Sequence, residues 1–278
     1  MLPPSPRPRR RLLAVDLDGT LVGADGRIDP RDADAIDRAR RAGVLVTLAT
    51  GRLAPSAIAV ARSLGVDAPL ICADGAALVC PRSGAILEAT HLAPPALTAL
   101  LDAAAMNDLA PFLFLVDAIL GDVSGAAHAD LVGAWSSKLV FSACLDEREH
   151  LGAVMAFGIG ARPSVEAAIA AIEDRDDTMD LSAFDLGEGS PWALRATPRG
   201  VGKHTALARL AAHLGVHRED VAAVGDWFND LTMLAWAGRS FAMGQSPASV
   251  REAAGCVLEA TAYTGGGVQE ALARWMGI

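Results

Sequence analysis

The sequence predicts an α/β protein in which a doubly wound parallel sheet forms a core and an α+β domain is inserted into that core. Apolar runs alternate with capped amphipathic segments at both ends of the chain, as is typical of parallel strands joined by helices. In the middle of the chain the alternation is irregular. We therefore predict a disordered tail over 1–10, a core made of 11–83 and 193–278, and an inserted domain over 84–192.

The first part of the core is predicted as strand, helix, strand, helix, strand. Asp29 is a suitable N-cap for the first helix, with Pro30 at its first position and Gly43 at its end. Gly65 ends the second helix in the same way. The predicted strands are 11–16, 44–50 and 69–73, and the predicted helices are 29–43 and 54–65.

The inserted domain and the second part of the core follow from the same signals. In the insertion we predict helices at about 94–109, 125–137 and 163–174, and strands at about 111–120, 153–159 and 178–184. Residues 192–197 bring the chain back to the core. There we predict helices over 202–215, 229–238 and 268–276, and strands over 221–226, 239–243 and 256–258.

Composition narrows the class of protein. The chain has 278 residues, 52% of them hydrophobic, which is ample for a core of this size. Its apolar runs fall short of the ~20 residues of a membrane span, and none resembles a signal peptide. A net charge of −9 argues against nucleic-acid binding by the basic tail. We expect a cytoplasmic protein without nucleic-acid or membrane partners, and the sequence is silent on oligomeric state.

The cysteines and lysines of the chain are few. Cys72, Cys80, Cys144 and Cys256 form no CxxC pair, so we expect reduced thiols. Lys138 and Lys203 are the only lysines in a chain otherwise rich in arginine. A lysine kept in such a chain is consistent with a need for a compact point charge.

Three predicted strands end in short polar groups beside a glycine. The first strand ends at Asp16, with Asp18, Gly19 and Thr20 behind it, and the second ends at Thr50, before Gly51. The strand over 221–226 ends at Asp226, with Asn229 and Asp230 close behind. Aspartates after strands are often helix caps. Ligands bind at the carboxyl ends of parallel strands, however, and three converging ends of this kind predict a ligand site.

The carboxylates at these strand ends would share one cleft. Like charges ~4 Å apart cost several kcal/mol at low effective dielectric, so either some of Asp16, Asp18, Asp226 and Asp230 are protonated or a cation lies among them. Oxygen ligands without histidine or cysteine favour a hard ion, and Mg²⁺ first. The incomplete ligand set suits Mg²⁺ shared with waters and a phosphate.

This arrangement is suited to phosphoryl transfer. A metal-bound aspartate such as Asp16 is a plausible nucleophile toward phosphorus, and Asp18 can serve as general acid and then as general base. Gly19 permits the tight turn that brings both carboxylates to one site. Phosphate oxygens can be bound by the Thr50 hydroxyl, by the backbone N–H groups of Leu17 and Gly51, and by the charge of Lys203.

Four motifs resemble, in order, those of the haloacid dehalogenase-like (HAD) hydrolase superfamily. They are DLDGT at 16–20, ATGR at 49–52, GVGKHTAL at 200–207 and GDWFND at 225–230. The insertion before the lysine motif resembles the Cof-type subgroup, whose cap is of the C2B kind. The resemblance covers nearly the whole chain beyond the tail. It implies a Rossmann-like core and Mg²⁺-dependent phosphatase activity through an aspartyl-phosphate.

The resemblance also implies a role for each motif residue. Asp16 becomes the nucleophile and Asp18 the acid/base, and the identity of residue 18 favours phosphatase over dehalogenase chemistry. The remaining implied roles are phosphate binding by Thr50, Lys203 and Asn229, metal binding by Asp226 with Asp16 and the Asp18 backbone carbonyl, and orientation of Lys203 or the metal shell by Asp230.

Several positions depart from the family pattern. Asp74-Gly75 stands where Asn-Gly is frequent, and 243–246 and 265–268 also differ, which puts substrate-side contacts in doubt. Trp227 is bulky for its motif, and packing is the simpler interpretation beside substrate stacking. We predict that the loop over 185–190, with Asp185 and Glu188, lies over the active site and sets specificity; a solvated turn is the alternative.

The sequence thus predicts a phosphatase for a small phosphorylated metabolite, with sugar phosphates as the first guess. A sugar phosphomutase or phosphotransferase of the same superfamily is an alternative. A catalytically retired binding protein is another, although the full set of motif residues argues against decay.

Overall fold

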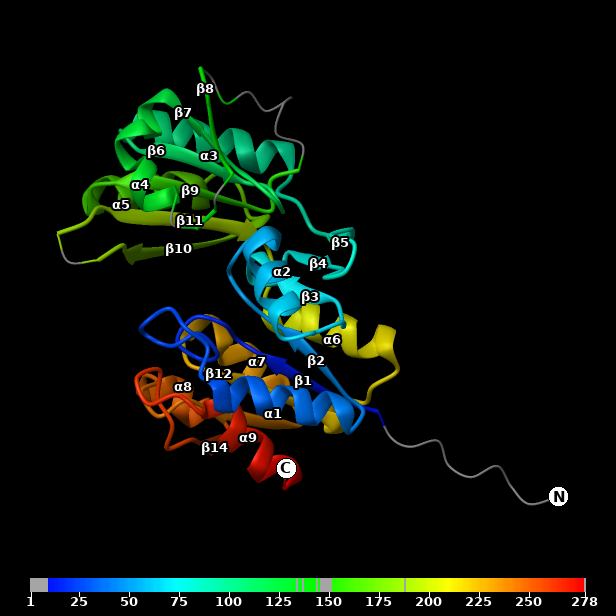
Figure 1. Ribbon diagram of the computed structural model, residues 1–278. Coiled ribbons are helices and arrows are strands. Elements are labelled where there is room, and N and C mark those ends of the chain that lie inside the picture. The colour runs from blue at the N-terminus through cyan, green and yellow to red at the C-terminus, as the bar shows by residue number, and fades with distance from the viewer. Residues whose placement is uncertain are drawn as a thin grey trace.

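The computed structural model describes residues 10–133, 135, 136, 138–143, 145, 152–187 and 189–277. The chain forms two lobes, one around a parallel sheet and one around a mixed sheet, with a small antiparallel sheet on the parallel-sheet side (Figure 1). Of the tail predicted over 1–10, all but Arg10 lies outside the described residues. No helix in the described part of the chain has both the length and the apolar character of a membrane span.

The core sheet has five parallel strands in the order β14-β13-β12-β1-β2. Val15, near the end of β1, is level with Val224 on β12 and with Leu48 on β2, so these three strands end at one edge. The strands are β1 (Arg11–Val15), β2 (Val44–Leu48), β12 (Val221–Gly225), β13 (Arg239–Ala242) and β14 (Cys256–Val257).

Helices cover both faces of this sheet, and the predicted doubly wound α/β class is confirmed. Leu13 and Val15 pack in the cluster that contains α1 (Pro30–Arg41) and α9 (Gly267–Met276). Leu12 and Ala14 point to the opposite side, where the helices are α6 (Lys203–Leu214), α7 (Leu231–Trp236) and α8 (Ala248–Ala253). Burial of alternate residues on both sides explains why these strands are continuous apolar runs.

The third predicted strand does not continue the parallel sheet. β3 (Leu70–Cys72) touches the end of β2 through one parallel bridge, Ala49 to Ile71, and then pairs antiparallel with a strand that we did not predict. The cause is a tight turn in which Asp74 has φ +52° and Gly75 has φ +99°. The small sheet contains β3, β4 (Ala77–Val79) and β5 (Ile86–Ala89), and α2 (Ala54–Ser63) precedes it.

The second lobe contains a six-stranded sheet in the order β10-β11-β9-β6-β7-β8, which we call the cap sheet. Its strands are β6 (Ala110–Phe114), β7 (Ile119–Asp122), β8 (Leu139–Ser142), β9 (Met155–Gly160), β10 (Met179–Asp185) and β11 (Trp192–Pro198). Its helices are α3 (Pro94–Met106), α4 (Ala129–Gly133) and α5 (Arg162–Glu173).

Two predictions in this lobe are wrong in detail. The strand predicted over 111–120 is a hairpin, because the Leu115 N–H donates to the Ala118 carbonyl and turns the chain between β6 and β7. The helix predicted over 125–137 begins as a 3-10 turn, Val123–His128, where the Asp122 carboxylate accepts from the Ser124 and Gly125 N–H groups. We did not predict β8.

The pairing of β11 bears on the domain boundaries. This strand lies between β10 and β9 in the cap sheet, whereas we predicted that residues 193 onward belong to the core. At the other boundary, β5 pairs with β4 in the small sheet. The division into a core and an inserted domain stays a prediction. Because β5 pairs within the small sheet and β11 within the cap sheet, we propose that the inserted domain begins near residue 90 and ends near residue 198.

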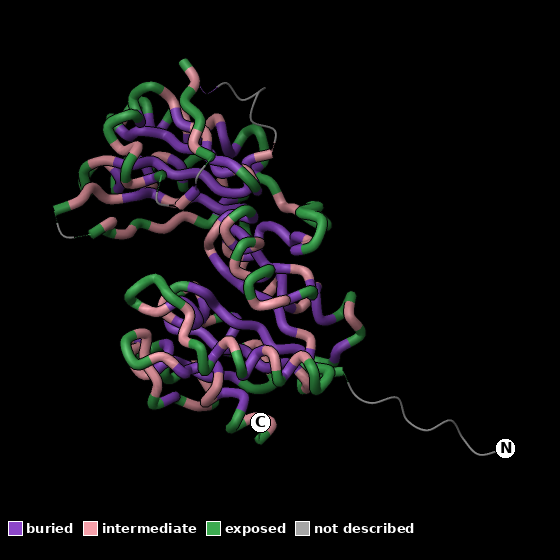
Figure 2. Tube along the Cα trace, in the orientation of Figure 1, coloured by how far each residue is buried: buried purple, intermediate pink, exposed green. Residues whose placement is uncertain are grey.

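The cap sheet has one face covered by its own helices. Leu113, Ala156 and Leu194 pack against α3 and α5, while Phe114 and Phe157 point to the opposite face and join the cluster shared with the core. Figure 2 shows the central strands of both lobes as buried and β10, at one edge of the cap sheet, as mostly intermediate or exposed. The Ala54 N–H of α2 donates to the Val116 carbonyl at 2.9 Å and links the two lobes.

Candidate active site

The shared edge of β1, β2 and β12 brings the predicted strand-end residues together. Asp16 follows β1 directly, and its N–H donates to the Val224 carbonyl of β12 at 3.0 Å. Gly19 has φ +86°, and a Cβ there would overlap the Asp226 carboxylate. The turn after β1 can therefore lie against the loop after β12 only with glycine at this position.

Lys203 forms a buried ion-pair network with two of these aspartates. Its ammonium group lies 2.5 Å from Asp16 Oδ1 and 2.8 Å from Asp230 Oδ1, and its side chain is inaccessible to solvent. Lys203 is the first residue of α6, where Thr205 Oγ1 both accepts from the Gly202 N–H and donates to the Gly202 carbonyl. The start of the helix thus fixes the lysine backbone below the cleft.

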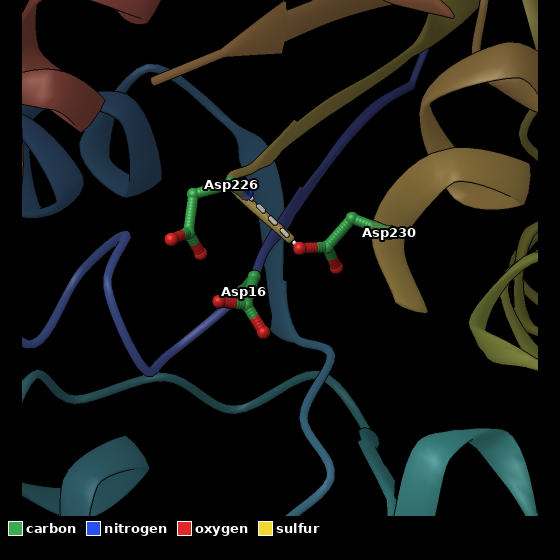
Figure 3. Close-up of side chains that lie close together, drawn as sticks. All are labelled: Asp16, Asp226 and Asp230. Atoms are coloured by element: carbon green, nitrogen blue, oxygen red, sulfur yellow. Dashed lines mark hydrogen bonds between the residues drawn. The ribbon is translucent and has the colours of Figure 1, made fainter. Parts of the chain in front are cut away.

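Asp230 uses both of its carboxylate oxygens within the protein. Oδ1 accepts from Lys203, and Oδ2 accepts from the backbone N–H groups of Asp226 and Trp227 at 3.0 and 3.1 Å. Figure 3 shows the bond to the Asp226 N–H and the three neighbouring carboxylates. Asp230 therefore holds the loop after β12 and the lysine at once, which is the geometry expected of a residue that orients Lys203.

The charges of this network shift the pKa values of its members. Burial alone would lower the pKa of Lys203, but the carboxylates of Asp16 and Asp230 outweigh it and raise that pKa, so the amine stays charged. Burial raises the pKa of Asp16 well above its ordinary value, against the attraction of Lys203. Burial, followed by the charge of Asp230, also raises the pKa of Asp226. The two carboxylates would ionise more readily with another positive charge nearby.

Carboxylate oxygens at this edge form a suitable binding site for a hard cation. Asp16, Asp226 and Asp230 each offer an oxygen, and these oxygens lie within 4.8 Å of one another. One ammonium group faces these three carboxylates, which leaves an excess of negative charge. Oxygen donors and excess negative charge fit a divalent ion of the Mg²⁺ class. Asp16 and Asp226 belong to the predicted ligand set.

Gln245 is a site residue that we did not predict. Its Nε2 donates to the Gly19 carbonyl at 2.8 Å and to Asp226 Oδ2 at 3.2 Å, while Thr20 Oγ1 donates to Asp226 Oδ1 at 3.1 Å. These bonds fix the Asp226 carboxylate. The only signal in the sequence was the departure over 243–246, which did not identify a partner.

Asp18 is paired with an arginine in the structure. Arg52 Nε lies 2.9 Å from Asp18 Oδ2, and its Nη2 contacts Oδ1. The Asp18 side chain is 60% exposed, so it faces the cleft rather than the buried network. Arg52 belongs to the second motif, but it was not predicted as a site residue. Thr50, two residues earlier, is fully buried, and its Oγ1 accepts from the Arg52 N–H at 3.0 Å.

Asp74 links the two lobes through side chains. Its Oδ2 accepts from Arg195 Nη1 at 2.7 Å, and its Oδ1 accepts from Asn229 Nδ2 at 2.9 Å. Arg195 lies on β11 of the cap sheet, so this ion pair joins the cap sheet to the turn after β3. Asn229, predicted to contact phosphate, donates to Asp74 in this structure. Neither Asp74 nor Arg195 was predicted as a site residue.

A cavity of about 800 Å³ lies between the two lobes. The core residues that line it include Asp16, Asp18, Gly51, Arg52, Asp74 and Asn229, which we call the floor, and beside them Leu53, Pro55, Ser56 and Ala59 at the start of α2. Its roof consists of cap-lobe residues: Phe114, Trp135, Ser136, Met155, Phe157 and Phe184. Trp227 also lines the cavity and is 56% exposed, and its ring contacts Phe228, so packing and substrate stacking both stay predictions.

The described residues of the predicted specificity loop, 185–187, 189 and 190, are not among those that line this cavity. Asp185 is exposed, its carboxylate accepts from the Gly187 N–H at 2.9 Å, and it is not among the lining residues. Glu188 lies outside the described residues. Leu17, whose N–H was predicted to bind phosphate, is buried between Asp16 and Asp18, and its carbonyl accepts from the N–H groups of Thr20, Leu21 and Val22.

Comparisons with known proteins agree on one family. A model of that family, described as haloacid dehalogenase-like hydrolase, matches residues 13–272. The pyridoxal phosphate phosphatase YbhA of Escherichia coli is 27% identical over 260 residues, which cover 89% of this chain and 93% of that protein. A phosphoglycolate phosphatase of Methanothermobacter thermautotrophicus is 28% identical over 269 residues, covering 96% and 99%.

Solved structures agree on the fold. A haloacid dehalogenase-like hydrolase from Bacteroides thetaiotaomicron has a TM-score of 0.80 to this chain at 21% identity, covering 95% of this chain and 98% of the other. At this identity the likeness extends to the fold, including both lobes.

Proposed function

The chain belongs to the haloacid dehalogenase-like hydrolases, and on that premise we propose that it is a Mg²⁺-dependent phosphatase that forms an aspartyl-phosphate on Asp16. The proposed substrates are phosphate monoesters of small molecules. The observation that carries the proposal is the buried contact of Lys203 with Asp16, at the end of β1 and below a cavity large enough for a small-molecule ester.

The first proposed step forms a bond between Asp16 and phosphorus. A carboxylate oxygen of Asp16 attacks the phosphorus atom, and the bond from phosphorus to the ester oxygen breaks. Asp18 gives its proton to that oxygen, and the alcohol leaves. Asp18 is paired with Arg52 in this structure, so this step requires Asp18 to leave Arg52 and to receive a proton from solvent before it reaches the ester oxygen.

The second proposed step returns the enzyme to its starting state. A water molecule attacks the phosphorus of the aspartyl-phosphate, and Asp18, now a carboxylate, takes the proton of that water. The bond between phosphorus and Asp16 breaks, and orthophosphate is released. Asp18 thus acts first as an acid and then as a base, and it regains the proton that it lost.

The remaining residues at this edge of the sheet bind the phosphoryl group and the cation. Lys203 neutralises the phosphoryl group and the attacking Asp16, and the Thr50 hydroxyl is proposed as a donor to a phosphoryl oxygen. Asp16 and Asp226 would hold the cation together with the Asp18 carbonyl. When bound, the cation would add positive charge at the phosphoryl oxygens. Asp230 and Gln245 act through their neighbours, because their bonds position Lys203 and Asp226.

The test is orthophosphate release from a panel of phosphate monoesters, with Mg²⁺ and with EDTA. Asp16→Asn keeps the shape of the side chain and removes the nucleophile, so we expect the Mg²⁺-dependent release to fall by at least ~10⁴-fold. Thermal unfolding of both proteins checks that the variant is folded. Release that persists in Asp16→Asn would contradict the proposed mechanism.

The same assay separates the two alternatives. A mutase or phosphotransferase would move phosphate between added sugars, which product analysis detects. A retired binding protein would bind orthophosphate without turnover of any ester.

A further inference from the structure

The roof of the cavity is built by one face of the cap sheet. Phe114 on β6 and Phe157 on β9 share that face, and Phe184 comes from β10. The opposite face is occupied by α3 and α5, so these rings are free to point toward the core. The aromatic side chains therefore lie opposite the charged floor, at the place where the part of a substrate beyond its phosphate would lie.

The rings form one connected cluster. The centroid of Phe157 lies 4.5 Å from that of Phe114, 5.3 Å from that of Trp135 and 6.0 Å from that of Phe184. The pairs with Phe114 and Phe184 are edge to face. Phe114 and Phe157 are buried, whereas Trp135 and Phe184 are half-buried. The contacts with the two buried rings fix the orientation of the other two, which offer the aromatic surface of the roof.

The roof offers few hydrogen-bonding groups. Among the cap-lobe residues that line the cavity in the described part of the chain, Ser136 has the only hydroxyl, and the others are aromatic rings and Met155. A polyhydroxylated leaving group would lose its bonds to water there and find few replacements. Sites that select such groups instead provide matching polar side chains.

Trp227 supplies a further ring from the core. It follows β12, lines the cavity, and is 56% exposed, although large aromatic side chains are usually buried. Phe228 contacts it edge to face at 5.1 Å and supports its orientation. A planar group above Asp16 would thus have aromatic contacts from both the core and the cap lobe.

We propose that the preferred substrate is the phosphate monoester of a planar aromatic or heteroaromatic alcohol, not of a sugar. This inference rests on the proposed function, because it assigns the leaving group of that same reaction. The phosphate is bound by the floor, and the ring is bound by the roof cluster and Trp227. The first guess from the sequence, a sugar phosphate, would find few hydrogen-bonding partners on this roof and is the alternative that the experiment tests.

The experiment compares matched esters under Mg²⁺. Benzyl phosphate and cyclohexylmethyl phosphate share their size but differ in planarity and aromaticity. Pyridoxal 5′-phosphate and ribose 5-phosphate add a heteroaromatic and a polyhydroxylated leaving group. We expect kcat/KM to be highest for the two aromatic esters, at least about tenfold above cyclohexylmethyl phosphate, since aromatic contacts add to simple burial. Equal or higher kcat/KM for ribose 5-phosphate would overturn the inference while the proposed function stands.

Variants test which rings are responsible for the preference for aromatic esters. Trp227→Ala is expected to lower kcat/KM for benzyl phosphate about tenfold more than for ribose 5-phosphate, and Trp227→Phe should restore most of the loss. Phe184→Ala tests the roof in the same way. Tyr263→Ala is the control, because Tyr263 is 84% exposed and does not line this cavity. An equal loss for both esters in Trp227→Ala would overturn the assignment of the ring site.

A binding measurement separates this inference from the activity. The Asp16→Asn protein is titrated by calorimetry with pyridoxal 5′-phosphate and with ribose 5-phosphate. If wild type hydrolyses no ester, the proposed function fails, yet tighter binding of the heteroaromatic ester would still support the ring site. Equal or weaker binding of that ester would overturn it.

Discussion

The floor and the roof of the cavity are built on opposite principles. The floor is charged and lies on a buried ion-pair network at the strand ends, in which each oxygen of Asp230 has a partner inside the protein. The roof uses aromatic rings from a sheet face, and Ser136 is its one hydroxyl among the described lining residues. On the proposed function, the floor would act on any phosphoryl group, whereas the roof would discriminate between leaving groups. If these proposals hold, most of the residues for chemistry and most of those for selection lie in different lobes, with Trp227 of the core as the exception, and their effects should be separable by mutation.

Among the changes that test this comparison, the loss of Lys203 has the largest expected effect. Lys203→Met keeps the length of the side chain and removes its charge, so we expect kcat to fall by about 10³-fold for every ester. Lys138→Met is a matched control, since Lys138 is 57% exposed and paired with Asp117 in the cap lobe. A fall in kcat that is confined to one class of leaving group would contradict the idea that the floor acts on phosphate alone.

Removal of a roof ring should cost stability as well as selection. Phe114 is 2% exposed, so Phe114→Ala is expected to lower the free energy of unfolding by about 3–5 kcal/mol. Trp227→Ala should cost less than about 1 kcal/mol, because that ring is largely exposed. Urea unfolding measures both. Similar costs would mean that Trp227 is a packing residue after all.

Metal binding tests the role of the strand-end aspartates without the use of a substrate. Mg²⁺ at about 100 times its Kd is expected to raise the free energy of unfolding by about 2.7 kcal/mol. Asp226→Asn should abolish most of this increase, while Trp227→Ala should retain it. Thermal unfolding with Mg²⁺ and with EDTA is the measurement, and a full Mg²⁺ effect in Asp226→Asn would contradict the proposed ligand set.

The smallest expected effect concerns the ion pair between the two lobes. Arg195 and Asp74 are 29% and 13% exposed, and we expect a coupling energy of about 1 kcal/mol in a double-mutant cycle. Arg195→Met, Asp74→Asn and the double variant are compared by urea unfolding. A coupling near zero would mean that the Ala54 to Val116 hydrogen bond and apolar packing suffice to hold the lobes together.

The residues at the strand ends could be predicted from sequence, because the carboxyl ends of parallel strands lie at the same edge of the sheet. Asp16, Thr50 and Asp226 each follow an apolar run, and such runs end at one edge of a parallel sheet. The four motifs also led to the correct family and its Cof-type subgroup, which the family match confirms. The roles of the individual floor residues stay predictions.

The roof could not be predicted, because an apolar run does not reveal which face of a sheet each residue occupies. Phe114 lay inside a run predicted as one strand, and the turn between Leu115 and Ala118 divides it. Arg195 reaches Asp74 only through the register of β11 against β9, where Arg195 is level with Phe157. Register between distant strands depends on tertiary packing, which local pattern does not contain.

The turn that carries Asp74 has a consequence for protein engineering. Gly75 has φ +99°, and a Cβ there would lie 2.3 Å from the Gly202 carbonyl oxygen, directly before Lys203. The same short turn therefore abuts the helix of the lysine and, through Asp74, receives the arginine of the cap sheet. A designer who grafts another enzyme's cap onto this core would need to keep this turn, because Asp74 is the acceptor for the ion pair from the cap. The first substitution to try in the grafted cap would be an arginine at the position that faces Asp74.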